Sequence, residues 1–140
     1  MLVGEAELCP EAEIVFGARR VCAMYASEQL RFAVKLAETI NASLVVAEPV
    51  DGCEPIWDNA EAVNGSIVVV DRGSCPFVDK AMNAQAAGAV AVLVANNKPG
   101  AAFAMPGNFS SVSIPAMLIT QEYGTSIKDG ASTVALKIGL

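Results

Sequence analysis

A strand, helix and strand pattern between residues 66 and 95 constrains the fold more than any other feature of this sequence. The run from Ser66 to Val70 is rich in β-branched residues, which is typical of a strand buried on both faces. The segment from Pro76 to Ala87 has helical spacing, and Ala89 to Ala95 is again apolar. A strand, a helix and a strand in this order favour a right-handed parallel βαβ unit. We therefore expect a mixed α/β domain.

Shorter elements are expected on both sides of this unit. Apolar or alternating runs bounded by turn formers predict strands at residues 14–16, 21–25, 44–47, 116–119 and 133–138. One helical turn is predicted at 58–63, and a short helix at 121–128 with Thr120 as its N-cap. Between Ser27 and Ile40 the pattern fits either a helix that begins at Ser27 or an alternating strand over 30–36, and both alternatives stay open. Residues 96–113 are rich in turn formers and predict a long loop.

The composition fits one domain of 140 residues and excludes several classes of function. The chain has no histidine, which excludes Ser-His-Asp and Cys-His catalysis and every zinc site that uses imidazole. The net charge is −6 and the Lys and Arg residues form no cluster, so we expect no nucleic-acid partner. No apolar stretch reaches the ~18–20 residues that span a bilayer, and Glu5 and Glu7 stand where a signal peptide has its apolar centre. We expect neither membrane insertion nor a signal peptide in the chain as given.

The cysteines and the glycosylation motifs bear on the compartment. The four cysteines form no Cys-x-x-Cys pair, which disfavours a thiolate metal site and favours disulfides; four buried thiols in a reducing cytosol are the alternative. Three Asn-x-Ser motifs favour a lumenal or extracellular address and predict N-glycosylation at Asn41, Asn64 and Asn108.

A series of acidic residues lacks the pattern of a calcium-binding loop and predicts a solvated acidic face; it comprises Asp51, Glu54, Asp58 and Glu61. We expect no metal and no cofactor.

The run from Ile67 to Ala89 resembles the signature of protease-associated (PA) domains. It reads as a hydrophobic strand, Arg72-Gly73-x-Cys75-x-Phe77, then Lys80, and then Asn-Ala-Gln-x-Ala-Gly-Ala ending at Ala89. The similarity continues upstream through Leu-Val-Val-Ala-Glu-Pro at 44–49 and Gly-Cys-Glu-Pro-Ile at 52–56, and downstream to Ile-Pro at 114–115. We expect a single PA-like domain over 1–140, well matched over 44–140 and poorly matched over 1–43.

The resemblance implies a fold and a class of function. PA domains are small β-sandwiches or open barrels flanked by helices, and a βαβ unit is built into them. They accompany catalytic domains in subtilisin-like and zinc aminopeptidases and also occur in RING ubiquitin ligases and vacuolar sorting receptors, without performing the chemistry. The expected function is therefore a non-catalytic module of a secretory or lumenal protein that binds a protein or peptide. The alternative is an accessory domain that shapes access to a catalytic domain of a secreted or vacuolar protease in the same full-length chain.

The resemblance also implies how the cysteines pair. The Cys of the Arg-Gly-x-Cys motif pairs with an upstream Cys in this family, which corresponds here to a disulfide between Cys53 and Cys75. Elimination then leaves Cys9 with Cys22 as the second pair. A bridge that closes a loop of the length between Cys53 and Cys75 stabilises a fold by about 3 kcal/mol on the chain-entropy model.

The candidate ligand site lies where the turn at residues 72–74 meets the loop that begins at Asn97. Both follow neighbouring buried strands, whose carboxyl ends form crevices in open α/β sheets, and the resemblance places the binding loop of sorting receptors at Arg-Gly-x-Cys. The candidate ligand-binding residues are Arg72, Gly73, Ser74, Asn97 and Met105.

Each candidate also has a structural alternative, and that of Gly73 is to supply an unusual backbone angle or a close approach. Arg72 is alternatively fixed by Asp71 or by loop carbonyls, and Ser74 is placed to cap the following helix. Asn97 suits a turn, and Met105 suits packing over the core.

Overall fold

The seven strands that the structure describes form a closed ring. This computed structural model describes residues 9, 11–16, 19–27, 29, 39–130 and 133–138. The strand order is β1-β2-β6-β5-β4-β3-β7, and β1 pairs with both β2 and β7, which closes the barrel. The strands are β1 (Ala12–Phe16), β2 (Arg19–Tyr25), β3 (Thr39–Val46), β4 (Ile67–Asp71), β5 (Ala91–Ala95), β6 (Ala116–Ile119) and β7 (Thr133–Ile138). The described helices are α2 (Ala60–Val63), α3 (Phe77–Ala86) and α4 (Gln121–Gly130).

One half of the barrel is parallel and contains the predicted βαβ unit. Strand β4 pairs in parallel with β3 and β5, and β5 pairs in parallel with β6. Helix α3 connects β4 to its neighbour β5, so the βαβ prediction and the mixed α/β class are confirmed. The strands β1, β2 and β7 complete the ring through antiparallel pairs.

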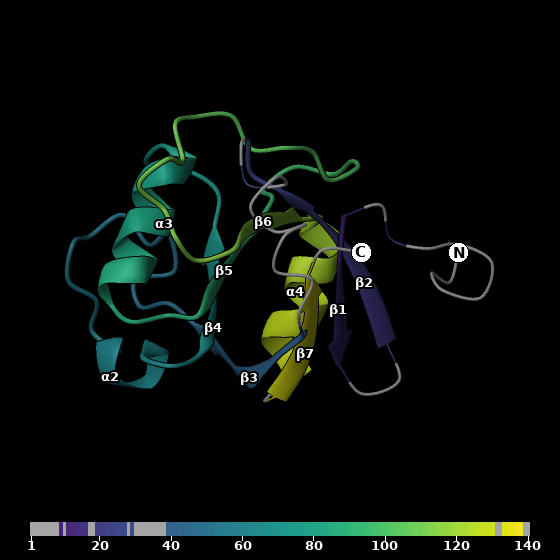
Figure 1. Ribbon diagram of the computed structural model, residues 1–140, viewed down its shortest axis with the longest axis horizontal. Helices are drawn as coiled ribbons and strands as arrows, with labels where there is room; N and C mark the ends of the chain where they lie inside the picture. Colours follow the sequence, from purple (N-terminus) through teal and green to yellow (C-terminus); the bar gives the residue numbers. More distant parts are fainter. Residues whose placement is uncertain are drawn as a thin grey trace.

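The parallel strands are buried on both faces because their side chains alternate between two apolar clusters. On β4, Ile67 and Val69 point into the barrel interior, where they pack with residues of β1, β2, β5 and β6. Val68 and Val70 point outward and pack with Ala81 and Ala84 of α3. The unbroken β-branched run in the sequence therefore predicted this double burial correctly. Figure 1 shows α2 and α3 together on the outer side of β4 and β5.

The N-terminus of α3 corrects one expectation. The helix begins at Phe77, and Pro76 occupies the N-cap position without a side-chain capping bond. Ser74 lies two residues too early to cap it, is exposed and has a φ of 73°. The predicted capping role of Ser74 is therefore wrong, because the backbone between Gly73 and Cys75 makes a tight turn before the helix starts.

The structure contains both disulfides, Cys9–Cys22 and Cys53–Cys75. The first joins Cys22 of β2 to the segment before β1, and the second joins the loop after β3 to the turn before α3. Residues 30–38 lie outside the described residues, and so does the choice between a helix and a strand in that segment.

Three parallel strands end at the same edge of the barrel. Asp71 at the end of β4 is paired with Ala95 at the end of β5, and Ala95 is paired with Ile119 at the end of β6. Helix α4 starts two residues after Ile119 and packs against this edge, where a Cβ on Gly124 would meet Cβ of Ala95 at 2.6 Å. Its buried Ile127 joins the interior cluster. The loops that follow β4 and β5 therefore lie beside the start of α4.

Candidate functional site

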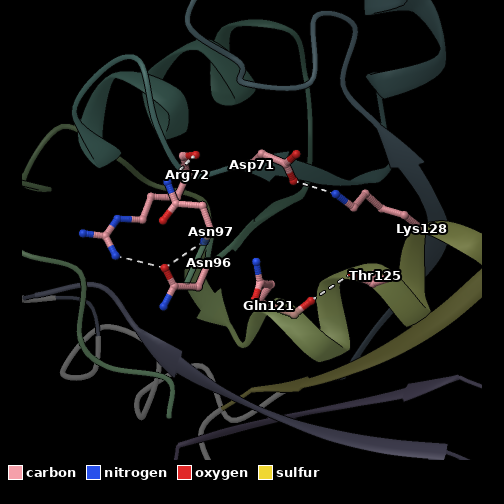
Figure 2. A network of polar contacts seen from close by, with 7 residues as sticks. All are labelled: Asp71, Arg72, Asn96, Asn97, Gln121, Thr125 and Lys128. Carbon is pink, nitrogen blue, oxygen red and sulfur yellow. Dashed lines mark hydrogen bonds and ion pairs between the residues drawn. The ribbon is translucent and has the colours of Figure 1, made fainter. Parts of the chain in front are cut away.

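The polar contacts at the edge where β4, β5 and β6 end are centred on Arg72. Its backbone N–H donates to the carbonyl of Ala95 at 2.9 Å, which joins the turn after β4 to the end of β5. Its guanidinium Nη1 donates to Oδ1 of Asn96 at 2.9 Å, and Nδ2 of Asn97 donates back to the Arg72 carbonyl at 3.3 Å. Figure 2 shows this network, with Gln121 and Thr125 of α4 drawn next to it. The two asparagines after β5 thus fix both the backbone and the side chain of Arg72.

Two aromatic rings complete the setting of the guanidinium. The Cζ atom of Arg72 lies 5.4 Å from the ring centroid of Phe77 and 5.6 Å from that of Phe103. The two rings contact each other edge-on, with centroids 6.3 Å apart. Asp71 does not hold Arg72; it pairs with Nζ of Lys128 at 2.7 Å. Arg72 is half-buried, and most of its guanidinium N–H groups have no hydrogen-bond acceptor among the described residues.

Lys80 holds the turn at residues 73–75 in place through buried hydrogen bonds. Its side chain on α3 is 0% exposed, and its ammonium donates to the carbonyl oxygens of Asp51 and Gly73, both at 2.6 Å. Burial lowers the pKa of Lys80 below its ordinary value, and the charges of Asp51 and Asp71 act in the opposite direction. The buried ammonium and the Cys53–Cys75 disulfide together connect the turn at 73–75 to the loop at 51–53.

The turn has a backbone that favours glycine. Gly73 has a φ of 123°, where an L side chain is strained, although a Cβ there would only make ordinary contact with Nδ2 of Asn97 at 3.6 Å. The requirement for glycine therefore comes from the backbone rather than from lack of space. Ser74 next to it also has positive φ and presents its side chain to solvent.

A cavity of about 540 Å³ opens beside this network, between the loop after β5 and the start of α4. Five of its seven lining residues carry a hydroxyl, amide or carboxylate group, although apolar atoms form the larger part of its surface; the lining comprises Pro99, Gly100, Thr120, Gln121, Glu122, Thr125 and Ser126. Sequence reasoning did not include the α4 residues in the site. A signal for these residues exists, because β6 is a third parallel strand and Thr120 is the first residue beyond its carboxyl end, the place where ligand crevices form in such sheets.

The structure brings most of the predicted ligand-binding residues together and separates one. Arg72, Gly73, Ser74 and Asn97 lie at the same edge. Met105 is fully buried in the outer apolar cluster, with Phe109 and Val112, so a ligand at the surface cannot reach its side chain. Met105 is therefore not part of the surface site, and the structure shows it packed over the core.

The remaining predicted sites lie elsewhere on the surface. Asn41, Asn64 and Asn108 are all exposed, as glycosylation requires. Within the described part of the chain, no group of three or more Cys, Asp and Glu side chains is arranged to hold a metal ion. None of the helices in that part is long and apolar enough to span a bilayer.

Comparisons with known proteins agree on one family. The family model described as "PA domain" matches residues 40–127. The chain is 38% identical over 88 residues to signal peptide peptidase-like 2 of Arabidopsis thaliana, which covers 61% of this chain and 16% of the relative. It is 33% identical over 99 residues to receptor homology region, transmembrane domain- and RING domain-containing protein 2 of the same plant, covering 68% and 22%.

A solved structure extends the likeness beyond the matched segment. The zinc aminopeptidase BSAP from Bacillus subtilis superposes with a TM-score of 0.65 at 25% identity, over 91% of this chain and 30% of that chain. The structural likeness therefore reaches beyond residues 40–127. The chain spans less than a third of the length of each of these three proteins.

Proposed function

The chain belongs to the PA domain family, and from this premise we propose that it is a non-catalytic module that binds the carboxyl end of a peptide or protein at Arg72. The observation that carries the proposal is the guanidinium itself. Asn96 and the rings of Phe77 and Phe103 hold it in one orientation and leave donors open. A planar guanidinium with open donors matches a carboxylate in a bidentate pair.

The preorganisation of Arg72 explains why binding would be favourable. A free arginine side chain loses rotamer freedom when it grips a ligand, at a cost of ~0.5–1.5 kcal/mol. Here the protein contacts have already fixed the side chain before a ligand arrives. The two phenyl rings also lie within 5.4 and 5.6 Å of the guanidinium Cζ and lower the local dielectric, which strengthens the charged contact.

The cavity beside Asn97 would receive the residues that precede the carboxylate. Its volume of about 540 Å³ lies in the range of pockets that hold drug-sized ligands, so a few terminal amino-acid residues can fit. The hydroxyl groups of Thr120 and Ser126 and the amide of Gln121 offer donors and acceptors, whereas the Thr125 hydroxyl donates to the Gln121 carbonyl at 3.2 Å and offers only an acceptor. We therefore propose that the end of the ligand carries side chains that can form hydrogen bonds with these groups.

The cysteines and sequons support a lumenal or extracellular address for this module. Both disulfides persist in an oxidising compartment, and all three Asn-x-Ser motifs are on the surface. We propose that the protein works in the secretory pathway and that these asparagines carry glycans.

A second candidate is an accessory role beside a peptidase domain. The likeness to BSAP favours it, because the similar region is only 30% of that zinc aminopeptidase. The same edge would then contact substrate on its way to a neighbouring active site. The natural coding sequence outside residues 1–140 separates the two candidates, since a peptidase domain in the same chain would favour the accessory role.

The proposal predicts a preference for free carboxyl termini. A random hexapeptide library with free carboxyl ends, captured on the immobilised protein, supplies the tightest peptides, and each is then compared with its C-terminally amidated form. We expect amidation to weaken binding about ten- to a hundredfold, the effect of losing one charge-assisted contact of about 1.5–3 kcal/mol. Calorimetry measures both affinities, and equal affinity for the two forms would contradict a carboxylate site.

A further inference from the structure

The two sulfur atoms of the Cys53–Cys75 disulfide have different surroundings. Sγ of Cys53 lies 3.5 Å from Nζ of Lys80 and 3.6 Å from the carbonyl oxygens of Asp51 and Gly73. Sγ of Cys75 is bonded to Cys53 and accepts no hydrogen bond from the described residues. One end of this disulfide thus contacts a cation, and the other end does not.

The ammonium of Lys80 is oriented toward Cys53 by its other bonds. An ammonium has three N–H donors, and two of them are used by the carbonyls of Asp51 and Gly73 at 2.6 Å. The third is left for Sγ of Cys53. Because the side chain is 0% exposed, water and salt screen this contact only weakly.

We propose that Cys53–Cys75 is a thiol-exchange site, at which an incoming thiolate bonds to Cys75 and Cys53 departs as a thiolate held by Lys80. The new sulfur–sulfur bond forms to Cys75 as the Cys53–Cys75 bond breaks, and the electron pair of that bond stays on Sγ of Cys53. With a dithiol as reductant, its second thiol loses a proton to water and attacks the mixed disulfide. Cys75 is released as a thiolate and takes up a proton, so that the protein disulfide is reduced and the dithiol is oxidised.

The charges near the two sulfur atoms predict which of them the incoming thiolate attacks. Exchange is faster when the departing sulfur is the more stabilised thiolate, and a lysine in contact lowers the pKa of a thiol. Cys75 precedes α3 and feels the positive end of the helix, but that end carries only about half a unit charge. The full charge on Lys80 at 3.5 Å from Cys53 is therefore the stronger influence.

Acidic groups near the site act against this preference. The carboxylates of Asp51 and Asp71 act on Lys80, Oδ1 of Asp51 also accepts from the backbone N–H of Cys53 at 3.0 Å, and Glu54 and Asp79 are the acidic neighbours along the chain. Glu54 and Asp79 are exposed, so solvent screens their effect on either sulfur. Both cysteines are half-buried, so access does not distinguish them and the preference rests on the charges.

Regiochemistry in the wild-type protein is the first test. The native protein is incubated with glutathione, free thiols are trapped with N-ethylmaleimide, and peptide mapping locates both labels. We expect glutathione on Cys75 and maleimide on Cys53 in at least about tenfold excess over the reverse. Glutathione on Cys53, or equal labelling of the two cysteines, would overturn the proposal.

A charge-removing variant tests the part played by Lys80. Lys80→Gln keeps an N–H donor but loses the charge, and Lys98→Gln removes the same charge from an exposed position. We expect the Cys75 to Cys53 labelling ratio to fall about tenfold in Lys80→Gln and to stay unchanged in Lys98→Gln. The Cys9–Cys22 bridge is the internal control for folding, because its unaltered reduction shows that the variant is not simply unfolded. An unchanged ratio in a folded Lys80→Gln protein would contradict the assignment, and if that variant does not fold, the wild-type labelling decides alone.

Discussion

Replacement of Lys80 by methionine is expected to lower the free energy of unfolding by about 2–4 kcal/mol. The variant keeps the apolar stem of the side chain but removes the donor of the carbonyl oxygens of Asp51 and Gly73, which lie 2.6 Å from Nζ. Half-buried carbonyls that lose their partner cost about 1–2 kcal/mol each. Removing the buried charge also removes its desolvation cost, which recovers part of the lost free energy of unfolding. The expected loss therefore stays below about 4 kcal/mol.

Urea unfolding with both disulfides intact measures the Lys80→Met effect. The matched variant Lys98→Met changes the same side chain at an exposed position and is expected to shift the free energy of unfolding by less than about 0.5 kcal/mol. Equal stability of Lys80→Met and the wild type would mean that the buried ammonium does not hold the two loops together.

The pH dependence of this difference has a definite sign. Burial lowers the pKa of Lys80 in the folded chain, so at alkaline pH the unfolded chain binds more protons. The stability advantage of the wild type over Lys80→Met therefore increases as the pH rises through the folded pKa toward the ordinary value of 10.5.

Arg72→Ala is expected to weaken binding of a free-carboxylate peptide about ten- to a hundredfold while the fold stays intact. The substitution removes the charged donor group and leaves the rings of Phe77 and Phe103 facing an empty position. Calorimetry gives the affinity, and the midpoint of thermal unfolding checks the fold. A well-folded Arg72→Ala protein with wild-type affinity would show that Arg72 serves only to hold the turn.

Two further variants separate the geometry of Arg72 from its charge. Arg72→Lys keeps a cation but cannot form a bidentate pair, so we expect it to recover less than half of the lost binding free energy. Lys98→Ala removes a nearby exposed charge and is expected to change the affinity by no more than about threefold. A general attraction between positive residues and an anionic peptide would instead make Lys98→Ala as damaging as Arg72→Ala.

The central part of the fold was predictable because its signals are local. The unbroken apolar run of β4, the spacing of α3 and the run of β5 each report burial within one element, and their order implies a parallel pair. Closure of the barrel was not predictable in the same way. It depends on pairing of β1 with β7, whose partners Ala12 and Ile138 lie at opposite ends of the sequence. No local pattern specifies that register.

The candidate site was also predictable from the sequence only where it depends on local signals. The turn at Arg72 follows a predicted strand, and its place beside Asn97 follows from the parallel neighbour. Sequence reasoning could not find Phe103, because its contact with the guanidinium depends on how a long loop folds back over α3. The same holds for Met105, whose burial is decided by that loop, and for the three contacts of Lys80, which converge from distant segments.

Amide chemical-shift mapping with a free-carboxylate peptide from the hexapeptide screen tests the ligand site most directly. We predict that the largest shifts occur in the turn after β4, in the loop after β5 and at the start of α4, at Gly73, Ser74, Asn97, Gly100 and Gln121. The amidated peptide should give much smaller shifts at the same positions. Shifts confined to residues 19–41, together with normal binding by Arg72→Ala, would contradict the proposal and move the site to a different part of the chain.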